Sequence, residues 1–427
     1  MTGDEMATTS PDSDRIATLD IVRGIAVMGI LAMNIVAFAM PFAAYINPMA
    51  YGGHDGINLA SWLFNTVLID GKMRGLFSIL FGASTLLVMQ KAEAAGRGGA
   101  SAHYRRMIFL LLFGLIHFYF IWFGDILSLY ALCGFIIYAF RNLSARALTR
   151  WAIVFLTVSF SMFSFMSLSA AMADNPNISA EQRKDMQGAK KQIELEVGAT
   201  SPKIKEDLEI YRGPYAGQLE QRLVKQTFFP FQTFFAFVWE TVGLMLIGMA
   251  LFKTGYLTGA MDERRYRKWA AWCFAIGIPG ALALAIMQLQ SGFDAALIFG
   301  SAIAWSMPFD VLLAIGWATL VILWVKRSGE SSLRDRVAAA GRMAFTNYLM
   351  TSIVMTAVFY GYGFGLFGEV GRAALWLFVI GMWALMLAWS KPWLERFNYG
   401  PLEWAWRSLA RGKLQPMRKA GPQPLPA

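Results

Sequence analysis

Charged side chains are scarce in this chain of 427 residues, where they make up only 15% of the composition. Soluble globular domains carry about 25% charged residues, so the composition excludes an ordinary water-soluble protein. Hydrophobic residues reach 56% and stand in long runs, each near the ~20 residues that a helix needs to cross a bilayer. Because these runs are continuous and do not alternate, they predict transmembrane helices and not a closed β-barrel.

Cysteine and histidine are also rare. The two cysteines, Cys133 and Cys273, lie inside apolar runs, which predicts buried free thiols and excludes a disulfide framework. The three histidines, His54, His103 and His117, are far apart in the sequence. We therefore expect no metal site and no permanently bound cofactor.

The net charge of +10 would suit a nucleic-acid-binding protein, but its distribution along the chain favours a membrane topology. We expect about ten spans, near 21–45, 57–90, 105–123, 126–141, 148–172, 228–252, 269–289, 302–325, 340–361 and 372–391. The basic clusters then all fall in loops on one side, together with the C-terminal tail. Since basic loops remain cytoplasmic, both termini are predicted to be cytoplasmic, and no nucleic-acid partner is expected.

The spans are predicted to form a single transmembrane helical domain over residues 15–411, between disordered tails at 1–14 and 412–427. Residues 173–227 separate the fifth span from the sixth and mix acids with bases. We expect this segment to be a helical excursion outside the membrane. Two interpretations stay open for it: a solvated excursion, or a lid over an external substrate site.

A polar stripe runs along the first span. On an ideal helix, Asp20, Arg23 and Asn34 lie within roughly a 60° arc, spread over about 21 Å. Asp20 and Arg23 are spaced to pair with each other at the cytoplasmic end, whereas Asn34 needs a partner on another helix. Ionisable residues at membrane depth are costly and mark functional sites by default, so all three are candidate substrate-binding residues.

The second span is interrupted by charged residues, and we expect it to be broken. Asp70, Lys72 and Arg74 separate two short apolar pieces, with Gly71 and Gly75 beside them. Broken helices at membrane depth are tolerated where they line a cavity. The N-terminus of the second half-helix would add positive potential to Lys72 and Arg74, which favours an anion site. The alternative is that both cations form internal salt bridges.

The candidate catalytic residues include His117 inside the third span and Asp125 at its outer end. On one continuous helix they would be about 12 Å apart and ~80° around the axis, so a direct pair requires the helix to end early. A histidine titrates near neutral pH and can act as a general base. The alternative is a core histidine bonded to a neighbouring helix.

Four further polar residues complete the candidate set. Glu240, Asp310 and Asn347 are isolated within apolar runs, and we count all three as candidate substrate-binding residues and the two carboxylates also as candidate proton carriers. His54 falls in a predicted external loop and is a second candidate base.

Several segments in order along the chain resemble the bacterial YeiB family, a family of integral membrane proteins catalogued as a domain of unknown function. The resemblance covers about residues 15–410 and implies a multi-pass protein of the bacterial cytoplasmic membrane. It rests on the segments "TLDIVRGIAVMGILAMNI", "GKMRGLFSILFGAS", "GLIHFYFIWFGDILSLYALCG", "GRMAFTNYLM" and "GPLEWAWRSL".

The opening span, with Asp20, Arg23 and Asn34, is also distantly similar to transmembrane acyltransferases such as heparan glucosaminide N-acetyltransferase. That resemblance implies acyl transfer from cytoplasmic acyl-CoA to an acceptor across the membrane, with a histidine as base. By position His54 corresponds to the histidine of the heparan branch, whereas His117 lies in a segment typical of the YeiB family. We expect His117 to act, with His54 as the second choice.

Two functional hypotheses follow. The first is an acyltransferase that acts on a glycan, lipid or small-molecule acceptor, with Arg23, Lys72 and Arg74 holding an acyl-CoA donor. The second is a transporter or exporter of a small solute, with Glu240 and Asp310 carrying protons. A membrane scaffold without chemistry is a third interpretation. The lipid bilayer is a partner under every hypothesis, and the oligomeric state, including a homodimer, stays open.

Overall fold

A computed structural model gives the fold of residues 11–94, 96, 98–329 and 331–419. The described residues form a bundle of α-helices, and their one β-type pairing is an isolated bridge between Phe397 and Arg418. The all-α prediction is therefore confirmed. Residues 1–10 and 420–427, the outer parts of the two predicted tails, lie outside the described residues.

The helices of the bundle are α1 (Pro11–Ala39), α3 (Gly56–Leu68), α4 (Lys72–Ala94), α5 (Gly99–Phe120), α6 (Leu127–Ile137), α7 (Ala145–Met172), α11 (Phe229–Lys253), α12 (Glu263–Gln290), α14 (Met307–Arg327), α16 (Ala344–Phe359) and α17 (Leu375–Arg396). The other helices are α2 (Phe42–Ile46), α8 (Ala180–Val197), α9 (Lys203–Arg212), α10 (Tyr215–Glu220), α13 (Ala295–Phe299), α15 (Ser332–Arg342) and α18 (Pro401–Arg411). Three helical turns complete the set: η1 (Tyr138–Phe140), η2 (Gln221–Lys225) and η3 (Gly300–Trp305).

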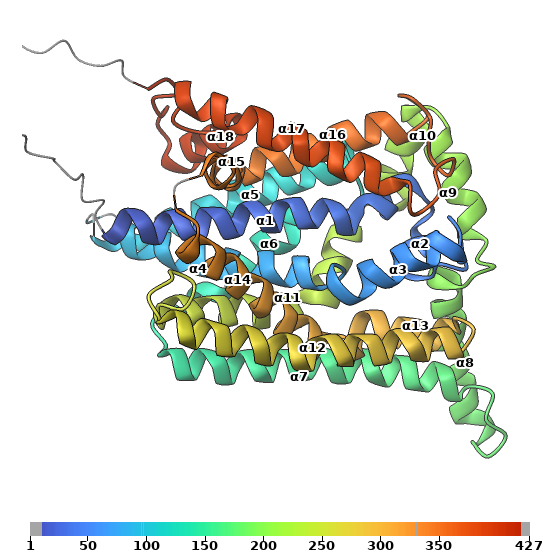
Figure 1. The fold of residues 1–427 in the computed structure, drawn as a ribbon. Coiled ribbons are helices and arrows are strands. Elements are labelled where there is room, and N and C mark those ends of the chain that lie inside the picture. Colours follow the sequence, from blue (N-terminus) through green and yellow to red (C-terminus); the bar gives the residue numbers. More distant parts are fainter. Residues whose placement is uncertain (1–10, 95, 97, 330, 420–427) are drawn as a thin grey trace, which may run out of the picture.

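The bundle helices run side by side along one direction, and the start of α1 lies at the same end as α18 (Figure 1). In the described part, seven helical segments are long and apolar enough to cross a membrane. The predicted spans at 126–141 and 340–361 correspond to shorter apolar helices. The count of ten crossings therefore stays a prediction, as does the cytoplasmic location of the termini.

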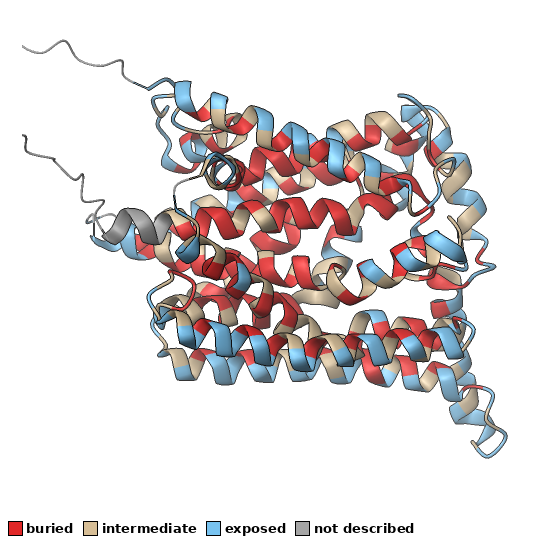
Figure 2. Cartoon of the chain, viewed as in Figure 1, coloured by how far each residue is buried: buried red, intermediate tan, exposed pale blue. Residues whose placement is uncertain are grey.

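Burial differs sharply between the central and the peripheral helices (Figure 2). In the most apolar stretch of α1, 83% of the residues are buried, whereas in the corresponding stretches of α7, α12 and α17 only 28% are buried. These outer helices expose large side chains, including Phe165, Trp272 and Leu377. An exposed apolar surface of this extent is unfavourable in water and stable in lipid. The protein is a helical membrane protein in which α1 forms the centre.

The second predicted span is broken, as expected. Helix α3 ends at Leu68 and α4 begins at Lys72. Between them the backbone N–H groups of Ile69 and Asp70 both donate to the carbonyl of Asn65, and Gly71 adopts a φ of +77°. A residue with a Cβ would be strained in this left-handed conformation, and its Cβ would lie 2.3 Å from Asp310. Glycine therefore permits both the break and the approach of α14.

Helices α4 and α11 pack closely through two glycines. A Cβ on Gly82 would lie 2.0 Å from the carbonyl oxygen of Met245, and a Cβ on Gly248 would lie 1.8 Å from that of Ile79. Small residues of this kind let membrane helices approach each other, because lipid supplies no hydrophobic driving force between them. This contact fixes how the charged start of α4 faces α11.

The segment 173–227 forms α8, α9, α10 and η2, which lie across the end of the bundle opposite α18 (Figure 1). The segment is packed against the bundle: Arg222 is fully buried and donates to the carbonyl of Tyr119, and the N–H of Gly361 donates to the carbonyl of Tyr211. The helical prediction agrees with the structure. Its placement outside the membrane stays a prediction.

The structure describes part of each predicted tail. Helix α1 already begins at Pro11, within the tail predicted at 1–14. At the other end, Asn398 bonds to the backbone of Pro416, Met417 and Arg418. These bonds hold the start of the tail predicted at 412–427 against the turn that follows α17.

The glycine contact leads to a stability prediction. Gly82→Ala and Gly248→Ala should each destabilise the protein by about 1–3 kcal/mol, because the added methyl group collides with backbone that cannot move aside. Thermal unfolding in detergent measures the effect. Gly381→Ala in α17 is the control, because a Cβ there meets nothing within 4 Å. Equal melting temperatures for all three variants would contradict the proposed close packing.

Candidate functional site

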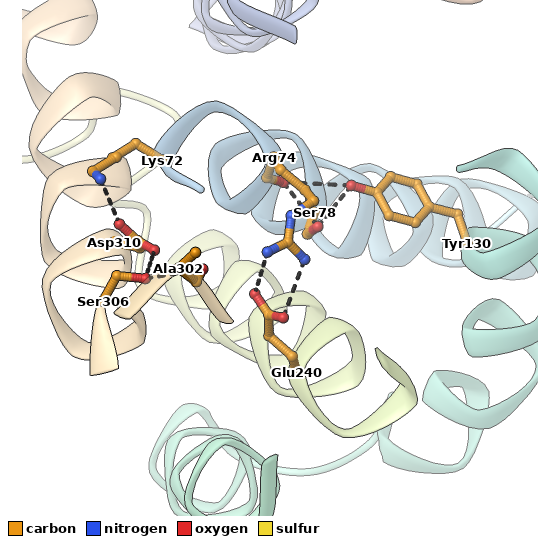
Figure 3. Close-up of polar contacts among 8 residues, drawn as sticks. All are labelled: Lys72, Arg74, Ser78, Tyr130, Glu240, Ala302, Ser306 and Asp310. Atoms are coloured by element: carbon orange, nitrogen blue, oxygen red, sulfur yellow. Dashed lines mark hydrogen bonds and ion pairs between the residues drawn. The ribbon is translucent and has the colours of Figure 1, made fainter. Parts of the chain in front are cut away.

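Two ion pairs occupy the start of α4, directly after the helix break (Figure 3). Lys72 pairs with Asp310 of α14, and Arg74 pairs with Glu240 of α11. The broken span had two interpretations, an anion site and internal salt bridges. The structure contains the salt bridges. They also account for the two carboxylates that the sequence left without partners.

The Lys72 pair is almost completely shielded. Its Nζ lies 2.8 Å from Asp310 Oδ1 and donates to the carbonyl of Thr66 at 2.6 Å, while only 2% of the lysine side chain is exposed. Ser306 donates to the second carboxylate oxygen of Asp310 at 2.7 Å. A buried pair needs such additional bonds, since its mutual attraction alone seldom offsets the loss of hydration.

The Arg74 pair has the two-point geometry typical of arginine and carboxylate. Its two terminal nitrogens lie 3.0 and 3.1 Å from the two oxygens of Glu240. The backbone carbonyl of Arg74 accepts from Ser78 at 2.9 Å, and the Ser78 hydroxyl contacts the hydroxyl of Tyr130 at 2.6 Å. This network connects α4 to α6 and α11, as the dashed lines of Figure 3 show.

A third carboxylate, Asp70, lies at the break itself. One of its oxygens is buried and has no hydrogen-bond partner among the described residues. Its charged neighbours are Lys72, Arg372 and Asp310, and the phenol of Tyr45 is close to the same group. Sequence reasoning missed Arg372, because it lies in the loop before α17 and carries no pattern that connects it to the break.

A histidine–aspartate dyad lies between α5 and α6. Helix α5 ends at Phe120, so the chain turns and brings His117 Nδ1 to 2.8 Å from Asp125 Oδ1. A direct pair of His117 and Asp125 requires this early end of α5. Asp125 also accepts from the N–H groups of Leu127 and Ser128 and from the Ser128 hydroxyl, at 3.1, 2.8 and 2.5 Å.

The dyad has the orientation of a general base. An ionised carboxylate can only accept, so the contact with Asp125 favours a proton on Nδ1, and in the neutral ring this leaves the lone pair on Nε2. The His117 side chain is fully buried, and its Nε2 has no hydrogen-bond partner among the described residues. Asp125 is itself held by the start of α6 and fixes the orientation of the ring.

A small cavity lies beside Tyr348. It is lined by side chains of α1 and α16, among them Asn34, Tyr348, Thr351 and Ser352, and has an accessible volume of about 10 Å³. That volume is close to what a single water molecule requires. The ring of Tyr348 contacts His117, with 5.2 Å between the ring centroids. Asn34 therefore faces protein at this cavity, and Tyr348 is the residue that the cavity shares with the surroundings of His117.

The remaining candidates lie elsewhere. Arg23 pairs with Asp20 at 2.7 Å, as the spacing predicts, and also donates to Ser84 of α4 at 2.9 Å. Asn347 is buried and bonds to Ala340, Ser390 and Trp389, which describes a structural residue that links α15, α16 and α17.

His54 is exposed in the loop between α2 and α3. A larger pocket of about 370 Å³ between α7, α8 and α13 is lined by Asp174, Lys190, Glu194 and Asp294 and contains none of the residues expected from the sequence.

These features define a helical membrane protein with buried ion pairs and a buried histidine–aspartate dyad. The family described as "Protein of unknown function (DUF418)" matches residues 251–413. The uncharacterized protein YxaH of Bacillus subtilis (strain 168) is 31% identical over 95% of this chain and 97% of its own length. The uncharacterized protein YeiB of Escherichia coli (strain K12) is 31% identical over 96% of this chain and 98% of its own length.

The chain therefore belongs to the family that contains YeiB and YxaH, which confirms the resemblance seen in the sequence. No solved structure matches the chain.

The buried ion pair of α4 and α11 gives a prediction for stability. Arg74→Met should cost about 3 kcal/mol or more, because it leaves the Glu240 carboxylate buried without its partner. The double variant Arg74→Met/Glu240→Met should recover most of the loss. Thermal unfolding of the single and double variants gives the coupling energy.

The matched control is the surface pair of Lys391 and Asp335, which are 2.9 Å apart and more exposed. Lys391→Met should change stability by less than about 1 kcal/mol. Additive effects at Arg74 and Glu240 would contradict the view that the two side chains stabilise each other.

Proposed function

We propose that the protein is a membrane-embedded acyltransferase that moves an acyl group from a cytoplasmic acyl-CoA donor to an envelope or small-molecule acceptor. The observation that supports this proposal is the His117–Asp125 dyad, which is buried and leaves Nε2 without a partner among the described residues. A buried histidine held by a carboxylate is the arrangement that general-base catalysis of acyl transfer requires.

The proposed reaction uses Nε2 of His117 twice. The nitrogen removes the proton from an acceptor hydroxyl or amine as that group attacks the thioester carbonyl, and the bond to sulfur breaks. The proton then passes from the imidazolium to the leaving thiolate, which gives free coenzyme A and the acylated acceptor. Asp125 stabilises the transient imidazolium through its bond to Nδ1. Asn34, which lines the small cavity beside Tyr348, would donate its amide N–H to the acyl oxygen.

The proposed setting is the bacterial cytoplasmic membrane, with the end of the bundle that carries α18 facing the cytoplasm. The relatives in Bacillus subtilis and Escherichia coli support a bacterial setting, and the basic loops support the orientation. The acceptor would approach from the opposite end, beneath α8, α9 and α10. In this proposal the segment 173–227 acts as a lid.

Transfer of a radiolabelled acetyl group from acetyl-CoA in membrane vesicles tests the proposal. His117→Gln should lower the rate by about 10²–10⁴-fold, the usual contribution of a general base. Asp125→Asn should lower the rate as well, because the amide no longer fixes the proton on Nδ1. Thermal unfolding of each variant confirms that the fold survives the substitution.

His54→Gln is the matched control, since this histidine is exposed in the loop between α2 and α3. It should retain the wild-type rate. Full transfer activity in His117→Gln would contradict the assignment of the base, and loss of activity in His54→Gln alone would transfer the role to the loop histidine.

Transport of a small solute is the second candidate, because of one specific observation. The broken span places the Lys72–Asp310 and Arg74–Glu240 pairs next to the unpaired oxygen of Asp70. Half-helix ends with neighbouring carboxylates are a common form of ion and proton site in transporters. A proton that moved onto one carboxylate would release its cation and change how α4 packs against α11 or α14.

Proton-driven uptake into vesicles separates this candidate from the enzyme. If the protein is a transporter, Asp310→Asn and Glu240→Gln should each remove the dependence of uptake on the pH gradient while His117→Gln has no effect. If the protein is the proposed acyltransferase, the same two variants should retain acetyl transfer in proportion to the folded protein that remains.

A further inference from the structure

Arginines from three separate elements converge at the end of the bundle that carries α18. Arg106 of α5 lies within electrostatic range of Arg23 of α1 and of Arg407 and Arg411 of α18. Arg407 is likewise close to Arg411 and Arg23. We name these four residues the arginine cluster. They are far apart in the sequence, so the fold itself assembles the cluster.

Aromatic contacts hold the cluster in place. The guanidinium of Arg106 stacks over the ring of Trp406 at 4.7 Å, and Trp406 Nε1 donates to the backbone carbonyl of Arg106 at 2.9 Å. Arg407 lies over the ring of Tyr399 at 4.8 Å. Stacking of this kind fixes a guanidinium plane and leaves its N–H groups free to donate. Two of the cluster side chains are thus positioned before any ligand arrives.

The two nearby carboxylates, Asp20 and Glu403, both act electrostatically on Arg407, but they are fewer than the four arginines of the cluster. Asp20 pairs with Arg23. Glu403 accepts bonds from the backbone N–H groups of Phe345 and Thr346 and from the Thr346 hydroxyl, so it stabilises the start of α16. Of the four cluster arginines, only Arg23 has an ion pair with a described carboxylate.

We propose that the arginine cluster is a binding site for a phosphorylated anion, in which Arg106, Arg407 and Arg411 donate to phosphate oxygens. Guanidinium groups bind phosphate by two parallel hydrogen bonds, and several of them together favour a diphosphate or a doubly phosphorylated molecule. A bound polyanion also removes the mutual repulsion of four like charges held close together. Two sources share this chemistry: a free nucleotide-like molecule such as coenzyme A, and the head group of an anionic lipid.

The site stands on its own contacts, whereas its identification as the acyl-donor site rests on the proposed function. It differs from the expectation that Lys72 and Arg74 hold the donor, since both cations are already paired with carboxylates. Arg23 is the one residue common to both descriptions. It lies on the same face of α1 as Asn34, so the cluster and the small cavity lie along one face of this helix.

Direct binding of coenzyme A tests the proposal without any measurement of acyl transfer. The full-length protein is placed in nanodiscs of phosphatidylcholine, and binding of radiolabelled coenzyme A is measured with inorganic pyrophosphate as competitor. Arg106→Gln, Arg407→Gln and Arg411→Gln should each weaken binding by about tenfold or more. Arg407→Lys should be intermediate, because it keeps the charge and loses the planar fork.

The control is Arg264→Gln/Arg265→Gln at the start of α12, which removes positive charge from the surface without touching the cluster. It should bind like the wild type, and thermal unfolding identifies any variant that has lost its fold. A second arm measures retention of phosphatidylglycerol over phosphatidylcholine by the same variants, using native mass spectrometry.

Binding of coenzyme A that depends on the cluster supports the site and identifies a soluble ligand. Selective retention of phosphatidylglycerol that depends on the cluster, without coenzyme A binding, supports the site and identifies a lipid. If neither probe responds to the cluster variants, the anion site is overturned. Cluster-dependent coenzyme A binding in a protein without acyl transfer would overturn the proposed function and leave the site intact.

Discussion

The cost of placing a charge inside a helical bundle controls the rest of this structure. An ionised side chain at membrane depth persists only where a partner replaces its lost hydration. Lys72 and Arg74 at the start of α4 therefore determine what α14 and α11 must supply, namely Asp310 and Glu240. These cross-helix pairs need helices that approach closely, and the glycines of α4 and α11 make that approach possible.

The same constraint separates paired charges from groups that remain available. At the helix break, Lys72 and Arg74 are each paired with a carboxylate, so the first role of these charges is to hold α4, α11 and α14 together. At the dyad, Asp125 is fully used while one nitrogen of His117 is not. At the arginine cluster, positive charge exceeds the nearby negative charge. We infer that chemistry takes place at the dyad and recognition at the arginine cluster, with α1 between them.

Local sequence patterns predict the helices and the break well. Long uncharged runs determine where helices form, and the charged residues around Gly71 mark where the second span must stop. The partners are harder to predict, since Glu240 lies 166 residues from Arg74 and no local period connects them. The His117–Asp125 pair depends on whether α5 ends at Phe120 or continues. If α5 continued as a regular helix, His117 and Asp125 would lie apart. Its end at Phe120 brings them together.

General-base catalysis at the dyad requires His117 in the form that carries its proton on Nδ1 and its lone pair on Nε2. Nitrogen NMR of the histidine-labelled protein in nanodiscs measures this directly, with His117→Gln used to assign the signals. If His117 acts as the base, Nδ1 is protonated, Nε2 is unprotonated, and the Nε2 signal changes when an acyl-CoA is added. A proton on Nε2 with Nδ1 unprotonated, or an Nε2 signal that ignores the donor, would contradict this role.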